Sequence, residues 1–113
     1  KEKVVTVFVV QEVSGRNVLS ARHYGDLKVL LPANANIMLS PAPTVRRLKD
    51  SLKNFSDEDY LLLMGDPAAI GLACVLASES NRGIYSILKW DRIESDYYPV
   101  KINIHQKGDS NEG

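Results

Sequence analysis

The segment from residue 59 to residue 78 constrains the fold most, because it joins an apolar strand to an apolar helix through one tight turn. The run Tyr60-Leu61-Leu62-Leu63-Met64 is short and continuous, which is typical of a strand buried on both faces. The turn Gly65-Asp66-Pro67 follows, and every residue from Ala68 to Ala77 is apolar or glycine. A buried strand that leads directly into a buried helix predicts the centre of a small α/β core.

The turn at residues 65–67 has the features of a helix start. Asp66 supplies a side-chain acceptor at the N-cap, and Pro67 suits the first helical position, where its missing N–H is not needed. A strand-to-helix turn also presents free N–H groups to an anion, which suggests a phosphate site. The sequence has neither a GxGxxG pattern nor a P-loop lysine here, and the Asp66 carboxylate would repel a phosphate. We therefore interpret Asp66 as a structural cap, and Ala69, Ala73 and Ala77 as a stripe of small residues for close packing.

The remaining patterns predict further strands and one more helix. The β-branched run 4–13 is apolar on both faces, which favours a central strand. Val45, Leu48, Leu52 and Phe55 recur at three- and four-residue spacing, which predicts one buried helix face beginning near Pro43 or Thr44. The predicted strands are 4–13, 27–31, 37–40, 60–64, 84–92 and 97–105, with an irregular or edge segment over 18–24.

The last two predicted strands form a hairpin, and the strand, helix and strand over 60–92 form a βαβ unit. In the second arm of the hairpin, the side chains of Tyr98, Val100, Ile102 and Ile104 alternate with polar neighbours, so we expect them to face the core. The sequence thus predicts an α+β fold with a mixed, mostly antiparallel β-sheet and two α-helices, in the approximate order βββαβαββ.

Length and charge limit the class of protein. A chain of 113 residues predicts one compact domain, 1–105, and a flexible polar tail, 106–113. Lys plus Arg equal Asp plus Glu at 14 each, so no global charge favours nucleic acid or an acidic membrane. Cys74 is the only cysteine, which excludes an intramolecular disulfide and favours a reducing compartment. No apolar run approaches the roughly 20 residues of a membrane span, and no signal-peptide pattern is present, so we expect a cytoplasmic protein.

The residue types that carry chemistry do not form catalytic or metal-binding patterns. His23 and His105 have no ligand-like spacing with each other or with Cys74, which we expect to be a small buried residue. The carboxylates of 57–59 and 91–96 flank connections, where a solvated role is usual. We therefore predict that the protein is not an enzyme and holds no cofactor and no metal.

Two surface features remain as candidate partner-binding sites. Basic side chains interleaved with aromatic rings can follow phosphates while the rings stack on bases. The alternative is a solvated helix face and an aromatic pair that packs across a hairpin, whereas an outward-facing Trp90 would favour a protein interface. The first candidate is the helix face with Arg46, Arg47, Lys49 and Lys53, and the second is the hairpin with Lys89, Trp90, Arg92, Tyr97 and Lys101.

The segments Tyr60–Pro67, Leu88–Arg92 and Tyr98–Val100 resemble small uncharacterised accessory proteins of tailed bacteriophages, over roughly residues 4–105. The resemblance implies a protein made in the cytoplasm of an infected bacterium, where it binds host or phage machinery. We therefore predict a non-enzymatic protein that acts through protein–protein interaction, including self-association as a homo-oligomer. The alternative is a nucleic-acid-binding accessory protein that uses the basic helix face and the aromatic hairpin.

Overall fold

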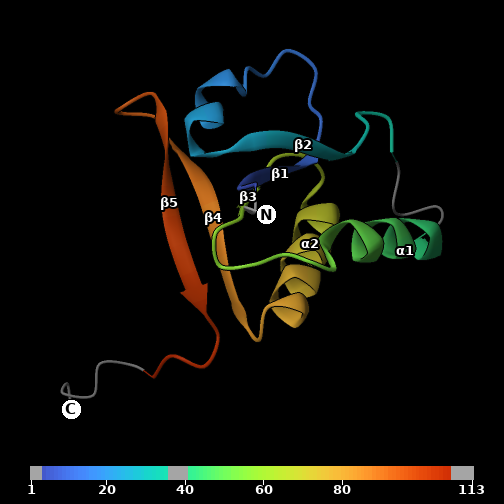
Figure 1. The fold of residues 1–113 in the computed structure, drawn as a ribbon. Coiled ribbons are helices and arrows are strands. Elements are labelled where there is room, and N and C mark those ends of the chain that lie inside the picture. The colour runs from blue at the N-terminus through green and yellow to red at the C-terminus, as the bar shows by residue number, and fades with distance from the viewer. Residues whose placement is uncertain (1–3, 36–40, 108–113) are drawn as a thin grey trace.

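A computed structural model describes residues 4–35 and 41–107 and contains one five-stranded sheet in the order β2-β1-β3-β4-β5 (Figure 1). The elements are β1 (Thr6–Gln11), the 3-10 helix η1 (Leu19–Tyr24), β2 (Asp26–Leu31), α1 (Pro41–Leu52), β3 (Tyr60–Leu62), α2 (Pro67–Ser80), β4 (Ile84–Asp91) and β5 (Asp96–Asn103). The predicted α+β class, the two α-helices and the central position of the first strand are confirmed. The predicted strand 37–40 and most of the predicted tail 106–113 lie outside the described residues.

The sheet is mostly parallel, so the predicted mostly antiparallel sheet is wrong. β1 pairs in parallel with both β2 and β3, and β3 pairs in parallel with β4. Only β4 and β5 pair antiparallel, as the predicted hairpin requires. The physical reason is that a helical segment follows each of the first three strands and returns the chain to the same starting edge. One of these connections, predicted as an irregular or edge segment over 18–24, forms the 3-10 helix η1.

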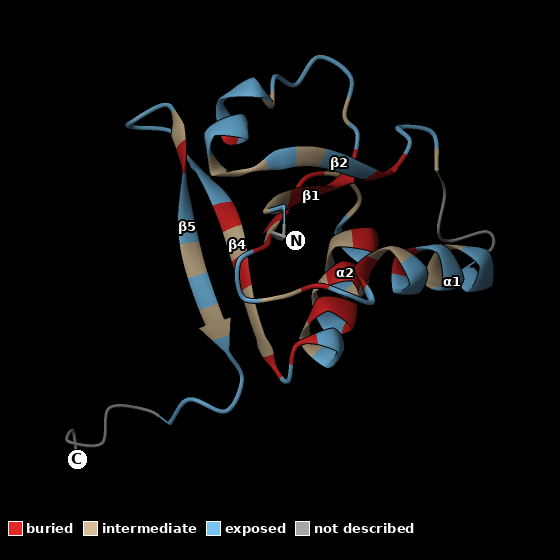
Figure 2. Cartoon of the chain, in the orientation of Figure 1, coloured by how far each residue is buried: buried red, intermediate tan, exposed pale blue. Residues whose placement is uncertain are grey.

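One face of the sheet is closed by the two α-helices. Leu48 and Leu52 of α1 pack in a single core cluster with Phe8 of β1 and Leu61 of β3. Phe55 lies beyond the end of α1 but is buried in the same cluster. The predicted stripe on α2 is confirmed, because Ala69, Ala73 and Ala77 are all buried, and this allows the helix to lie close to its neighbours (Figure 2).

The opposite face is covered only by η1 and the loop before it. A second cluster joins Ala21 of η1 to Val7, Leu62, Leu88 and Tyr97 from four strands. A six-residue 3-10 helix cannot cover five strands, so this face is protected over part of its area only.

The hairpin packs differently from its predicted pattern. Tyr97, expected on the solvent side, is 7% exposed, whereas Tyr98, expected in the core, is 42% exposed. The reason is that η1 covers the Tyr97 face, where the Tyr24 hydroxyl donates a hydrogen bond to the Tyr97 carbonyl oxygen over 3.0 Å. Val100 and Ile102 lie on the other face and are half-buried, so both faces of β5 take part in packing.

Candidate functional site at the carboxyl edge of the sheet

The carboxyl ends of β1, β3 and β4 meet at one edge of the sheet, because these strands are parallel. Open α/β sheets bind ligands outside this edge, above all where successive connections leave toward opposite faces. Here η1 follows β1 on one face and α2 follows β3 on the other, so the gap between β1 and β3 is that point. The next gap along the edge lies between β3 and β4.

The gap between β1 and β3 is closed by one buried side chain, Gln11. Its Nε2 donates to the carbonyl oxygens of Pro32 and Ala35 over 3.2 and 3.3 Å. Its Oε1 accepts the backbone N–H of Asp66 over 2.7 Å. The space that remains beside it is too small for a water molecule. Gln11 therefore ties the end of β1 to the loops after β2 and β3 and leaves no room for a ligand.

The turn after β3 has the predicted capping geometry and depends on Gln11 as well. Asp66 Oδ1 accepts the backbone N–H of Ala68 over 2.8 Å, and Pro67 is the first residue of α2, so the predicted cap is confirmed. Gly65 has a φ of +117°, and a Cβ at this position would lie 2.4 Å from the Cβ of Gln11. Only glycine allows the turn to approach Gln11 so closely.

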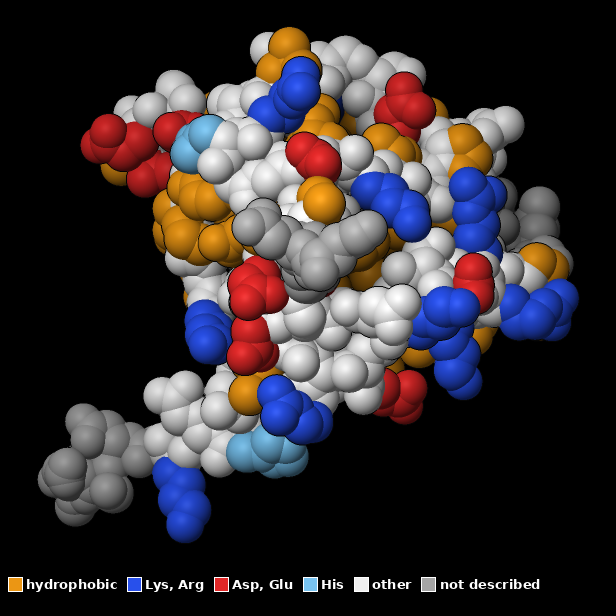
Figure 3. Space-filling model, viewed as in Figure 1, with side chains coloured by type: hydrophobic (Ala, Val, Ile, Leu, Met, Phe, Trp, Pro, Cys, Tyr) orange, Lys and Arg blue, Asp and Glu red, His pale blue; other side chains and the backbone are white. Residues whose placement is uncertain are grey.

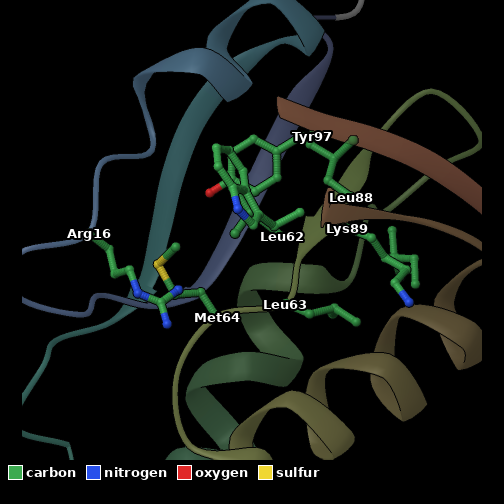
Figure 4. A pocket seen from close by; sticks show the side chains of 9 residues that line it. Arg16, Leu62, Leu63, Met64, Leu88, Lys89 and Tyr97 are labelled. Atoms are coloured by element: carbon green, nitrogen blue, oxygen red, sulfur yellow. The ribbon is translucent and has the colours of Figure 1, made fainter. Parts of the chain in front are cut away.

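The gap between β3 and β4 is open, because the two strands differ in length. β3 ends at Leu62, opposite Leu88, whereas β4 continues to Asp91. Within the described residues, 89–91 have no strand partner on the β3 side. The result is a hollow of about 270 Å³, here called the carboxyl-edge hollow (Figure 4). It is lined by Arg16, Leu62, Leu63, Met64, Ile87, Leu88, Lys89, Trp90 and Tyr97.

An aromatic pair forms one wall of the hollow. Trp90 of β4 and Tyr97 of β5 are cross-strand partners, and their rings meet edge to face with centroids 5.0 Å apart. This confirms the predicted packing across the hairpin. Trp90 nevertheless remains 47% exposed, so half of its surface is available to a partner. Burial raises the pKa of Tyr97, and the nearby positive charge of Arg16 lowers it in part.

Arg16 lies at the centre of this region, and sequence reasoning did not find it. It lies in the loop after β1, where its backbone N–H donates to the Val13 carbonyl oxygen over 3.1 Å. Its side chain extends beside Met64 (Figure 4). Arg16 also lines two adjoining hollows, one of about 400 Å³ with Trp90 and Arg92 and one of about 290 Å³ above Met64. In the sequence, Arg16 is marked only as part of a turn, and a turn pattern does not show which strands the side chain will lie beside.

The structure divides the predicted hairpin residues between two faces. Trp90 and Tyr97 line the hollow, and Arg92 lines the adjoining one from the turn after β4. Lys89 reaches the rim of the hollow but points away from Tyr97, because alternation along β4 turns it toward the helix-covered face (Figure 4). Lys101 lies on the same face as Tyr97, four residues further along β5, and is not part of the lining.

The basic helix face lies apart from the aromatic pair. Arg46, Arg47 and Lys49 are exposed on α1, which packs on the face opposite to η1. Figure 3 shows that Lys and Arg side chains gather over α1. Lys53, just past the end of α1, forms an ion pair with Asp50 at 3.3 Å, and both side chains are largely exposed. Such an exposed pair contributes little to stability. The two predicted partner-binding surfaces therefore do not join into one.

The other candidate residues have structural surroundings. Asp59, expected in a solvated connection, is buried, and its carboxylate accepts the backbone N–H groups of Thr6 and Ser56. Cys74 is half-buried rather than buried, and desolvation raises the pKa of its thiol, although a hydrogen bond with Tyr85 lowers it in part. His23 and His105 are both exposed. Among the described residues, no group of three His, Cys, Asp or Glu side chains has a geometry that could hold a metal ion.

The fold and this edge define a small α+β domain built on a five-stranded sheet, with one face closed by helices and the other partly open. The chain belongs to the Phage Pam3 gp32-like protein family, whose model matches residues 5–104. The resemblance to phage proteins seen in the sequence is thereby confirmed. No curated protein and no solved structure matches the chain. No helix in the described part of the chain is long and apolar enough to cross a membrane.

Proposed function

We propose that this phage-family protein is a non-enzymatic accessory protein of the bacterial cytoplasm that binds a protein partner through the carboxyl-edge hollow. The observation that carries this proposal is the half-exposed Trp90, which stands beside the buried Tyr97 over an apolar floor. Trp, Tyr and Arg are the residues that contribute most binding energy at protein interfaces, especially around a pocket that excludes water. The lining of the hollow contains one of each, namely Trp90, Tyr97 and Arg16.

The form of the site also favours a protein partner over a small substrate. The hollow of about 270 Å³ adjoins two others, of about 400 and 290 Å³, that share Arg16, so the site is a row of hollows open at the surface rather than one enclosed pocket that would bury most of a small ligand. The carboxyl-edge hollow has room for an anchoring side chain of a partner. The carboxyl-edge gap at which α/β enzymes commonly bind their ligands is filled by Gln11.

The alternative function is nucleic-acid binding, and the exposed cations of α1 favour it. Arg46, Arg47 and Lys49 have no ion-pair partner among the described residues. The aromatic rings that were expected to stack on bases lie on the other face of the sheet, so α1 would contact phosphates alone. Such binding depends strongly on salt, and titration of a short single-stranded oligonucleotide at low and high salt tests it.

Site-specific photo-crosslinking tests the proposal. We would place p-benzoylphenylalanine at position 90 in one variant and at position 98 in a matched control, express each in bacteria infected by a phage of this type, and irradiate the cells. Trp90 and Tyr98 lie on neighbouring strands with similar exposure, 47% and 42%, but on opposite faces of the sheet. We expect adducts from position 90 at least about fivefold more abundant than from position 98, because a bound anchor residue would contact only the first.

The chemical nature of the adducts separates the two functions. Adducts that a protease removes and a nuclease does not would support a protein partner. Equal labelling at both positions would overturn the proposed site. Adducts that a nuclease removes would support the alternative function instead.

A further inference from the structure

We propose that the carboxyl-edge hollow recognises a short acidic segment of its partner, in which one large apolar side chain sits against Trp90 and an adjacent carboxylate binds Arg16. This proposal rests on the proposed function and adds the chemistry of the partner. It would make the hollow a site for a linear motif, with an apolar anchor and one negative charge, rather than for a broad flat surface.

The apolar half of the motif follows from the floor of the hollow. Leu62, Met64 and Leu88 are at most 5% exposed and form its base, and Trp90 forms a half-exposed wall. Burying apolar surface against these side chains contributes roughly 25 cal/mol per Å² removed from water. A volume of about 270 Å³ accepts one large side chain such as Leu, Phe or Trp, so we expect a single anchor.

The acidic half of the motif follows from Arg16. Its side chain has no hydrogen-bond or ion-pair partner among the described residues, and it extends over Met64 at the meeting point of three hollows (Figure 4). Arg16 is exposed, and a guanidinium binds best to a carboxylate that can accept two parallel hydrogen bonds from it. Arg92 supplies a second positive charge at the adjoining hollow.

The hairpin turn makes a phosphate chain a poorer occupant than a peptide. The turn and its two flanking residues carry three carboxylates, from Asp91, Glu94 and Asp96, and one guanidinium, from Arg92. Asp91 accepts a hydrogen bond from the backbone N–H of Ile93 in the turn, and Asp96 accepts one from the backbone N–H of Tyr97 in β5. A nucleic acid needs a continuous row of cations, whereas one peptide carboxylate needs only the guanidinium of Arg16, which comes from the loop after β1 and not from this acidic turn. We therefore expect one or two acidic residues beside the anchor and no long acidic run.

Selection from a random peptide library on the full-length protein tests this proposal. We expect the enriched dodecapeptides to carry Asp or Glu within about three positions of Leu, Phe or Trp, as one extended strand rises about 3.3 Å per residue. Fluorescein-labelled copies of these peptides would then be titrated with the protein, and fluorescence anisotropy would give each dissociation constant.

Matched charge reversals identify where the peptides bind. Arg16→Glu and Arg46→Glu change the net charge equally, but Arg46 lies on α1, away from the hollow. We expect Arg16→Glu to weaken binding at least about tenfold, because it replaces an attraction with a repulsion, and Arg46→Glu to weaken it by less than about twofold. Equal effects of the two variants would overturn the proposal. Circular dichroism spectra would confirm that both variants are folded.

A third variant, Trp90→Ser, separates failure of this proposal from failure of the proposed function. If the selected peptides contain no acidic residue but bind the Trp90→Ser variant more weakly, the acidic motif is wrong. The proposal that the hollow binds a protein partner would then still hold. If no selected peptide depends on Trp90, both proposals are wrong. If a labelled twelve-nucleotide oligothymidine binds in a Trp90-dependent manner instead, the nucleic-acid alternative replaces them.

Discussion

Two gaps at the same edge of one sheet have opposite characters in this protein. Between β1 and β3, Gln11 fills the space and satisfies three backbone groups, from Pro32, Ala35 and Asp66. Between β3 and β4, the early end of β3 leaves a hollow beside Trp90. The first gap is polar and closed, whereas the second is open, with an apolar floor and the charged side chains of Arg16 and Lys89 among its lining.

The difference shows that strand length and one side chain decide which gap is open. Both gaps lie at the carboxyl edge, where ligands of α/β sheets are commonly found. The hydrogen bonds of Gln11 close one gap and form a clasp that holds the loops after β2 and β3 against the end of β1. β4 continues for three residues, 89–91, beyond its last pair with β3, and this leaves the other gap open.

The largest expected effect comes from forcing a side chain into the closed gap. Gly65→Ala places a Cβ 2.4 Å from the Cβ of Gln11 at a φ of +117°, so both the contact and the backbone are strained. We expect a loss of about 3 kcal/mol or more in the free energy of unfolding. Chemical denaturation followed by circular dichroism measures this loss.

Gly71→Ala is the control for that substitution, since a Cβ at this position of α2 meets nothing within 4 Å. We expect it to stabilise the protein by about 0.5–1 kcal/mol, because alanine favours the helix more than glycine does. A Gly65→Ala variant as stable as the Gly71→Ala variant would show that the gap is not closed in the way described.

A smaller loss is expected from removing the polar groups of the clasp while keeping its volume. Gln11→Leu removes the side-chain partner of the Asp66 N–H and of the Ala35 carbonyl oxygen, whereas the Pro32 carbonyl oxygen keeps the N–H of Ala35. We expect the free energy of unfolding to fall by about 2–3 kcal/mol in denaturant titrations. The neighbouring Glu12 is exposed, so Glu12→Leu should change it by less than about 0.5 kcal/mol. Similar effects of the two substitutions would contradict a structural role for Gln11.

The smallest effect concerns the open gap and appears only at high pH. Burial raises the pKa of Tyr97 above the unfolded value of about 10, so the folded state holds its proton more tightly. The stability present below about pH 10 is therefore lost as the pH rises toward and through the folded-state pKa. We expect the free energy of unfolding of the Tyr97→Phe variant to fall less steeply above pH 10 than that of the original protein. Denaturation at a series of pH values measures this difference.

At pH 7 the same variant should match the original protein closely, because the Tyr97 hydroxyl has no hydrogen-bond partner among the described residues and the bond from Tyr24 goes to its backbone. Identical pH profiles for the two proteins would indicate that Tyr97 is not desolvated in the wall of the hollow.

Local features of the sequence predicted local structure well. The Asp66–Pro67 start of α2, the buried stripe of Ala69, Ala73 and Ala77, and the hairpin of β4 and β5 all follow from contacts between residues near one another in the chain. Half of the candidate site was also predictable, because Trp90 and Tyr97 face each other across that hairpin. The sequence did not predict that Tyr97 is buried and Tyr98 exposed, because this depends on where η1 packs.

The sequence by itself determined the central strand, the apolar helix and the aromatic pair, because periodicity and capping act over a few residues. The tertiary structure alone decided the strand directions, since an apolar strand has the same composition in a parallel or an antiparallel pair. It also decided the site. Gln11 fills one gap and Arg16 reaches the other only because parallel strands bring the loop after β1 beside the ends of β3 and β4.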